Sequence, residues 1–372
     1  TSPTSAHRIT EVRFFVHYDA LSEFNGSLTS PGCDFSRVVN APWTDGAGRL
    51  HPAGQSWNDL RASLIEAHAD GLTPVVSIAG YPGPTARPAW DQPAPDPTTV
   101  AGDWELRCGV RGILSAISRL PAADQPHTWE AFNEPDAVPV YNGPGEIGPG
   151  ACAVSAAGSP GVDGAAKAAC AYALIAAGIH DYPGHSGDTV IAGTLSNPSL
   201  PYLSAYAAQL TSMAPGTAYP STWSVHDYGD VTRSYAGIDV SGLRAFDLAL
   251  RTDTAGRATD LWVTESGTDL TDQQPDARCG QPPQVPPILG ACVNGRPARQ
   301  ALDAQAFFAL PEAGVAVPVT HLFWYEWQGE VNWDSGLTDA AGAPRVGWCE
   351  FYGSGVCGGS PSVPPGPAPV TP

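Results

Sequence analysis

The chain has 372 residues, of which 42% are hydrophobic and 9% aromatic, so it can bury a large core and disorder is excluded for most of its length. Its net charge of −19 and isoelectric point near 4.6 argue against nucleic acid or an anionic membrane as a partner. The length exceeds that of a usual domain but suits an α/β barrel that forms a single unit.

Short apolar runs alternate with helical patterns along the whole chain. The runs predict strands at 12–18, 74–79, 128–133, 189–195, 223–228, 261–265 and 321–327. The patterns between them predict helices at 57–69, 104–120, 165–181, 200–213, 243–250 and 298–310. Near-continuous apolar strands separated by helices indicate parallel pairing with both faces of the sheet covered. So many units exceed an ordinary doubly wound sheet and predict an α/β fold of the (β/α)8 TIM-barrel class.

An eighth strand is not evident in the sequence. Either the segment 37–40 is a degenerate strand, or the first strand of the barrel precedes Thr1 and is missing or replaced.

Two connections, 136–163 and 268–297, are long and rich in Gly and Pro, and each holds cysteines. Because loops that follow barrel strands lie on the C-terminal face, we expect both connections there, pinned by disulfides. The eight cysteines include no C-x-x-C pair, which favours disulfides over zinc ligation. Proximity suggests the pairs Cys152–Cys170, Cys279–Cys292 and Cys349–Cys357, which leaves Cys33–Cys108. Sequence alone allows many other connectivities.

We expect a secreted, extracellular protein, because the eight cysteines favour disulfides formed in an oxidising compartment. The start at Thr1-Ser2-Pro3-Thr4 resembles a processed terminus, and the sequence shows neither a signal peptide nor a membrane span. We expect a catalytic domain over 1–357 and a Pro/Gly-rich tail or linker over 358–372, with a further module or an envelope anchor as a possible continuation.

Two short motifs carry the chemistry. They are Trp129-Glu130-Ala131-Phe132-Asn133-Glu134-Pro135 and Leu261-Trp262-Val263-Thr264-Glu265-Ser266-Gly267. In each motif a carboxylate, Glu134 or Glu265, follows an aromatic-rich apolar strand. Two carboxylates on rigid strand ends that can converge in space are what the cleavage of a glycosidic bond requires.

The strand ends together resemble those of clan A glycoside hydrolases, the retaining (β/α)8 enzymes that include families 5 and 39. The resemblance rests on Asn133-Glu134-Pro135, His226-Asp227-Tyr228, Thr264-Glu265-Ser266 and an aromatic final strand. It extends from about Val12 to Trp327 and is specific only at the strand ends. It implies that Glu134 is the general acid/base and Glu265 the nucleophile.

The same resemblance implies supporting roles for several other side chains. Asn133 would donate to the sugar 2-hydroxyl, Tyr228 would orient the nucleophile, and His226 would be a partner in the substrate subsite or behind it. Trp324 or Trp327 would form the sugar platform, and by position alone His17 and Tyr81 would line the pocket. As alternatives, His226 and Tyr228 could be hydrogen-bonded core residues, and each tryptophan could be core filler. Glu326 and Glu330 are rival carboxylates for an inverting reaction.

The sequence therefore predicts a secreted retaining glycoside hydrolase that acts on a poly- or oligosaccharide, with endo attack favoured. The alternatives are an exo-acting β-D-glycosidase or α-L-arabinofuranosidase, a transglycosylase, and a carbohydrate-binding barrel without activity. No metal or organic cofactor is implied, because the segment 143–148 matches G-x-G-x-x-G only as a Pro-containing loop and no metal-binding motif occurs. The expected partner is a carbohydrate, with no nucleic acid and no membrane insertion.

Overall fold

The structure is a computed structural model that describes residues 9–17, 23–24, 33–34, 43–44, 50–51, 55–79, 97, 100–137, 162–196, 200–213, 219–233, 240–267, 296–325, 336–337 and 351. The chain divides into two compact units. The larger unit comprises Thr10–Val225 and Ala249–Leu261, and the smaller unit comprises Thr1–Ile9, His226–Leu248 and Trp262–Pro372. The tail at 358–372 and the segment 37–40 lie outside the described residues, and the single domain over 1–357 stays a prediction.

All seven predicted strands are present. They are β1 (Glu11–His17), β6 (Thr73–Ala79), β7 (Thr128–Glu130), β8 (Thr189–Leu195), β9 (Thr222–His226), β10 (Asp260–Ser266) and β11 (Val319–Trp324), hydrogen-bonded in chain order. The pairs from β1 to β9 are parallel, as near-continuous apolar strands require. Two short antiparallel pairs were not predicted: β2 (Glu23–Phe24) with β3 (Cys33–Asp34), and β4 (Trp43–Thr44) with β5 (Leu50–His51). The part of the chain that the structure describes holds no eighth strand of the main sheet.

All six predicted helices are also present. They are α1 (Gln55–Ala69), α2 (Val100–Ile117), α4 (Val162–His180), α5 (Leu200–Ser212), α7 (Ser241–Asp253) and α8 (Arg296–Ala309). The sequence did not predict the short helix α6 (Tyr228–Arg233) or the 3-10 turns η3 (Ala122–Asp124) and η4 (Leu310–Glu312). The alternation of strands with helices is therefore the one that the apolar runs indicated.

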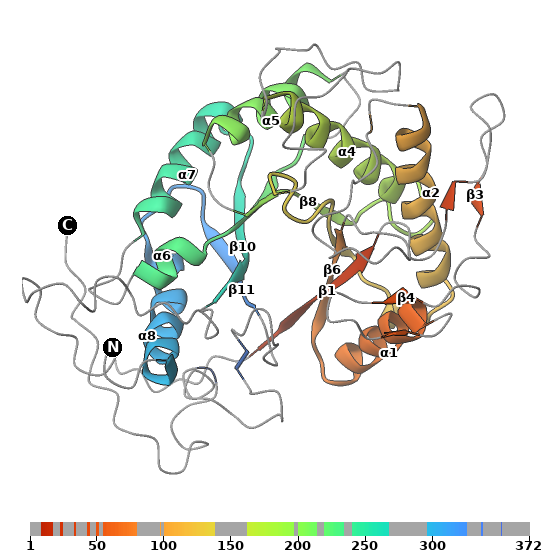
Figure 1. The fold of residues 1–372 in the computed structure, drawn as a ribbon, viewed down its shortest axis with the longest axis horizontal. Coiled ribbons are helices and arrows are strands. Elements are labelled where there is room, and N and C mark those ends of the chain that lie inside the picture. Colours follow the sequence, from red (N-terminus) through yellow and green to blue (C-terminus); the bar gives the residue numbers. More distant parts are fainter. Residues whose placement is uncertain are drawn as a thin grey trace, which may run out of the picture. The chain divides into compact units, whose positions relative to one another are not determined.

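The core of the larger unit lies between the sheet and the helices α2, α4 and α5. Val76 of β6 and Trp129 of β7 are fully buried and are register partners in the sheet. Helix α4 packs against both α2 and α5, and the three lie side by side in Figure 1. Helix α4 is long and apolar enough to cross a membrane, but 83% of its most apolar window is buried in the structure, as in the core helix of a folded domain.

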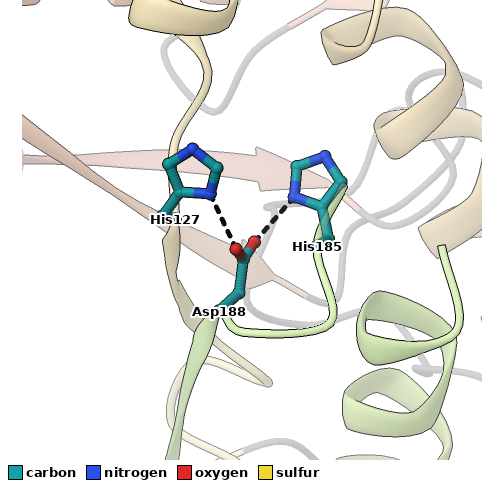
Figure 2. A group of neighbouring side chains, drawn as sticks. All are labelled: His127, His185 and Asp188. Atoms are coloured by element: carbon teal, nitrogen blue, oxygen red, sulfur yellow. Dashed lines mark hydrogen bonds and ion pairs between the residues drawn. The ribbon is translucent and has the colours of Figure 1, made fainter. Parts of the chain in front are cut away.

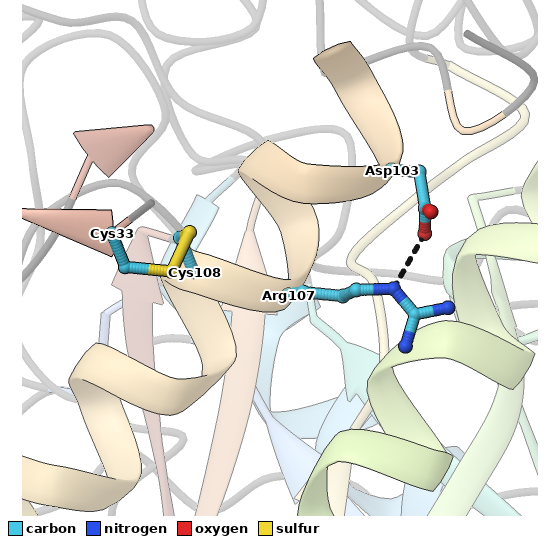
Figure 3. The surroundings of a disulfide bond; sticks show 4 residues. All are labelled: Cys33, Asp103, Arg107 and Cys108. Carbon is cyan, nitrogen blue, oxygen red and sulfur yellow. Dashed lines mark hydrogen bonds and ion pairs between the residues drawn. A yellow bond between two sulfur atoms is a disulfide. The ribbon is translucent and has the colours of Figure 1, made fainter. Parts of the chain in front are cut away.

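A disulfide joins Cys33 of β3 to Cys108 of α2 and confirms the predicted pairing (Figure 3). The two cysteines are 75 residues apart, and closing a loop of that length removes about 4 kcal/mol of chain entropy from the unfolded state. Cys170 is also disulfide-bonded. The other predicted pairs involve cysteines outside the described residues.

A bulge in β8 shapes the C-terminal end of the sheet in the larger unit. The register of β8 with β9 shifts between Gly193 and Leu195, and Gly193 and Thr194 have φ values of +90° and 51°. A Cβ at Gly193 would lie 2.8 Å from the backbone oxygen of Ser224, so only glycine fits there. The bulge leaves the carbonyl of Thr194 to accept a hydrogen bond from the N–H of Glu134, 3.0 Å away.

We expect Gly193→Ala to lower the free energy of unfolding by about 3 kcal/mol, because backbone strain and a clash with a backbone oxygen act together. Gly71→Ala is the matched control, since Gly71 has φ 71° and nothing lies within 4 Å of the position that a Cβ would take there. The control should lose only about 1 kcal/mol, the cost of the left-handed conformation. Urea denaturation measures both, and equal losses would contradict the account of the bulge.

Two buried carboxylates organise the backbone of the smaller unit. Asp230 accepts hydrogen bonds from the N–H groups of Gly242 and Leu243, at 3.0 and 2.7 Å, and so caps the first turn of α7. Asp247 accepts from the N–H groups of Ala316 and Val317, at 3.0 and 2.8 Å, just before β11. These bonds satisfy backbone donors that would otherwise be buried without partners.

Candidate active site

The two predicted catalytic carboxylates lie just beyond the end of β7 and near the end of β10. Glu134 belongs to the larger unit and Glu265 to the smaller one. Each carboxylate is positioned by the strand end and the hydrogen bonds of its own unit.

The turn that carries Glu134 is hydrogen-bonded to the strands on both sides of β7. The N–H of Asn133 donates to the carbonyl of Ile78 on β6 at 2.9 Å, and the N–H of Glu134 donates to the carbonyl of Thr194 on β8 at 3.0 Å. Glu134 has φ 44°, a conformation that residues other than glycine rarely adopt. Strained backbone held by its surroundings is typical of functional sites.

A buried ion pair lies directly beneath this turn. The guanidinium of Arg13, on β1, donates from Nε to Glu130 Oε2 and from Nη2 to Asn133 Oδ1 at 2.6 Å and Ser77 Oγ at 3.1 Å. The side chain of Arg13 is 5% exposed and that of Glu130 is fully buried. Because arginine has only donors, the oxygen of the Asn133 side-chain amide must face it, and the amide NH2 group points away from the guanidinium.

The network continues from Glu130 into β8 and β9. Ser224 Oγ donates to Glu130 Oε1 at 3.4 Å and lies 2.8 Å from Thr194 Oγ1. Sequence reasoning missed both Arg13 and Glu130. The available signal was a charged residue next to large apolar ones in each strand, Arg13 between Val12 and Phe14 and Glu130 after Trp129, a position where an unpaired charge is very costly.

We expect Glu130→Gln to lower the free energy of unfolding by about 3 kcal/mol, because it leaves the Arg13 guanidinium buried without its carboxylate. Asp103→Asn is the matched control. Asp103 pairs with Arg107 one turn along α2 at 2.8 Å, but the Arg107 side chain is 40% exposed (Figure 3). That change should cost less than about 1 kcal/mol. If urea denaturation shows that both variants lose a similar free energy of unfolding, the buried pair stabilises the protein no more than the exposed pair does.

In the smaller unit, Glu265 is held by residues at and just beyond the end of β9. Its side chain is 8% exposed, and Tyr228 Oη donates to Glu265 Oε2 at 2.9 Å. His226 Nδ1 lies 3.4 Å from the same oxygen. The structure therefore brings together His226, Tyr228 and Glu265, three of the residues predicted from sequence.

The backbone around Glu265 is fixed by its neighbours. The N–H of Asp227 donates to the carbonyl of Glu265 at 3.0 Å, and Ser266 Oγ donates to the carbonyl of Asp227 at 2.9 Å. The N–H of Tyr325 donates to the carbonyl of Ser266 at 2.7 Å. The carboxylate thus sits on a strand end that is tied to the segments on both sides.

The remaining predicted residues are placed as follows. Trp324 contacts the rings of Phe307 and Phe351, with centroids 5.5 and 5.8 Å away, so it belongs to an aromatic cluster with α8, and its role as a platform stays a prediction. His17 ends β1, but its side chain lies outside the described part of the structure. Tyr81, Trp327, the rival carboxylates Glu326 and Glu330, and the segment 143–148 also lie outside it.

Comparison with known proteins shows the fold. No protein-family model matches the chain, and no curated protein matches its sequence. A β-glucosidase from Thermotoga maritima is 11% identical, with a TM-score of 0.51 over 94% of this chain and 83% of that one. A family 5 xyloglucanase from Paenibacillus pabuli is 12% identical, with a TM-score of 0.51 over 92% and 85%.

A third similar structure is the exo-β-1,4-mannosidase Op5Man5 from Opitutaceae bacterium strain TAV5. It is 15% identical, with a TM-score of 0.50 over 92% of this chain and 52% of that one. At such low identity the likeness shows the fold alone, and it confirms the predicted (β/α)8 class.

Proposed function

We propose that the protein is a retaining glycoside hydrolase that cleaves a poly- or oligosaccharide by double displacement. The observation that carries the proposal is the carboxylate of Glu265, buried at a strand end and bound by Tyr228 Oη, in a fold whose β7 end presents a second carboxylate, Glu134. A retaining mechanism needs one carboxylate as nucleophile and one as acid and base.

In the first step, a carboxylate oxygen of Glu265 forms a bond to the anomeric carbon of the sugar. The bond to the leaving oxygen breaks, and Glu134 gives that oxygen its proton. In the second step, the ionised Glu134 takes a proton from water, and the water oxygen displaces Glu265 from the anomeric carbon. The hydrogen bond from Tyr228 to Oε2 orients the Glu265 carboxylate for the attack.

Asn133 supplies the contact that strengthens at the transition state. Arg13 holds the carbonyl oxygen of the Asn133 side chain, so its amide N–H groups are the donors available to a sugar 2-hydroxyl. Such a hydrogen bond gains strength as positive charge develops on the sugar ring. The buried ion pair beneath the turn thus sets the direction of a substrate contact.

Endo attack on a polysaccharide outside the cell is the form of this activity that we favour. The disulfide bonds at Cys33, Cys108 and Cys170 support an oxidising compartment. An exo-acting β-D-glycosidase or α-L-arabinofuranosidase is the alternative, and a transglycosylase would use the same residues with an acceptor sugar in place of water. Product lengths distinguish endo from exo attack, and an added acceptor alcohol distinguishes transfer from hydrolysis.

The decisive test is cleavage of a panel of polysaccharides and aryl glycosides by the wild type, Glu134→Ala and Glu265→Ala. We expect each variant to lose roughly 10³-fold or more in activity. Azide should rescue Glu134→Ala on an activated aryl glycoside and give a glycosyl azide with the anomeric configuration of the substrate. Azide with Glu265→Ala should give the opposite anomer, because it attacks in place of the nucleophile.

Glu66→Gln, on the exposed side of α1, is the control for removal of a carboxylate and should match the wild type. If folded wild type cleaves nothing on the panel, or if both site variants match it, the carbohydrate-binding alternative replaces the enzyme.

We further expect Tyr228→Phe to lower kcat roughly 10- to 100-fold with a smaller effect on KM, because the lost hydrogen bond orients a reacting group. Tyr182→Phe is the control: its hydroxyl lies 3.4 Å from the exposed Ser118 Oγ, and kcat should not change. Steady-state kinetics on the best substrate of the panel provides the measurement. Unchanged kcat in Tyr228→Phe would remove Tyr228 from the mechanism.

A further inference from the structure

A second group of chemically active side chains lies in the larger unit, at the opposite end of β7 from Asn133 and Glu134. His127 directly precedes β7, Asp188 directly precedes β8, and His185 lies in the turn between α4 and β8. Figure 2 shows both imidazole rings directed at the carboxylate of Asp188 from opposite sides. The mechanism proposed above uses none of the three.

The three side chains converge closely. His127 Nδ1 lies 2.7 Å from Asp188 Oδ1, and His185 Nδ1 lies 2.6 Å from Asp188 Oδ2. The two nitrogens and the carboxylate oxygen lie within 4.8 Å of one another. Imidazole nitrogen and carboxylate oxygen are ligands that zinc and related divalent metals accept, and three protein ligands with one open position form a common set.

The surroundings hold the carboxylate in place. Trp129 Nε1 donates to Asp188 Oδ2 at 2.7 Å, and His180 Nε2 lies 3.0 Å from the backbone oxygen of Asp188. The rings of Trp129 and Tyr182 each have centroids 5.9 Å from that of His185. Hydrogen bonds from outside to a ligating carboxylate orient it and are typical of built metal sites.

The site has one buried and one accessible imidazole. The side chain of His185 is 1% exposed and that of His127 is 58% exposed. An ion can therefore reach the Asp188 carboxylate from the side of His127. Because the His127 ring is exposed, it can rotate so that its Nδ1 moves away from Asp188 Oδ1 and leaves room for an ion between the two atoms. The fourth position would face water.

We propose that His127, His185 and Asp188 bind a divalent transition-metal ion of the zinc class. The sequence did not indicate this site, because its ligands come from two distant segments and form no contiguous motif. The site lies away from the predicted catalytic residues of its unit, so the ion would stabilise the start of β7 and β8 and take no part in cleavage.

The same atoms form hydrogen bonds when no ion is bound, so the two states compete. In the metal-bound state the ring proton of His185 moves to Nε2, which is buried and has no hydrogen-bond partner among the described residues. The free energy lost by burying one N–H without an acceptor is much smaller than the free energy gained from three metal–ligand bonds. The metal-bound state is therefore favoured when the ion is supplied.

The test uses the full chain without a polyhistidine tag, stripped of metal with a chelator that is then removed. Zn²⁺ is titrated by calorimetry, and Co²⁺ by its visible absorption, which reports coordination by nitrogen and oxygen ligands. We expect saturable binding of one equivalent and a melting temperature that Zn²⁺ raises by a few degrees. His127→Ala should keep the fold, because its ring is exposed, and should lower the affinity more than about tenfold.

His68→Ala, an exposed histidine in the last turn of α1, is the matched control and should bind as the wild type does. The proposal is overturned if the wild type shows no saturable binding, if His127→Ala binds as tightly as the wild type, or if His68→Ala loses as much affinity as His127→Ala. It is also overturned if His127→Ala lowers the melting temperature equally with and without Zn²⁺ and no Co²⁺ bands appear. The three side chains would then serve only to hydrogen-bond the start of β7 to the start of β8.

Discussion

The buried ion pair of Arg13 and Glu130 is the interaction on which the larger unit depends. Arg13 on β1 reaches Ser77 on β6 and Glu130 on β7, and Glu130 in turn contacts Ser224 on β9, which contacts Thr194 on β8. A polar chain thus crosses five neighbouring strands inside an otherwise apolar sheet. Because charges buried in this way are very costly unless paired, the strands must keep the register that brings these groups together.

The same pair connects folding to the proposed chemistry. A slip of one residue in β1 would turn Arg13 to the other face of the sheet and leave Glu130 without its partner. Asn133 would then lose the donor that fixes its amide, and the turn that carries Glu134 would lose a support. Replacing a buried ion pair with apolar residues often leaves stability unchanged. We therefore infer that the role of this pair is to select one strand register and to orient the side chain of Asn133.

The sequence predicted the regular elements well because each follows a clear apolar pattern. Helix α6 was missed because six residues are too few to show a helical period. Proximity of Tyr228 to Glu265 could be expected only from the resemblance to known strand-end motifs, since spacing alone does not place two strand ends side by side. The pairing of Arg13 with Glu130 spans 117 residues, and although a charge in a largely apolar strand signals a buried partner, a single sequence does not say which residue that partner is. The His127, His185 and Asp188 cluster was missed for the same reason.

The disulfide between Cys33 and Cys108 has a consequence for a chain that meets proteases. The loop that it closes contains β4, β5, α1 and β6, and β6 is the strand between β1 and β7. A single cut anywhere between the two cysteines leaves both fragments covalently joined. The nicked molecule keeps β6 tethered beside its partners, so it can retain its sheet after damage that would divide a chain without this bond into two separate pieces.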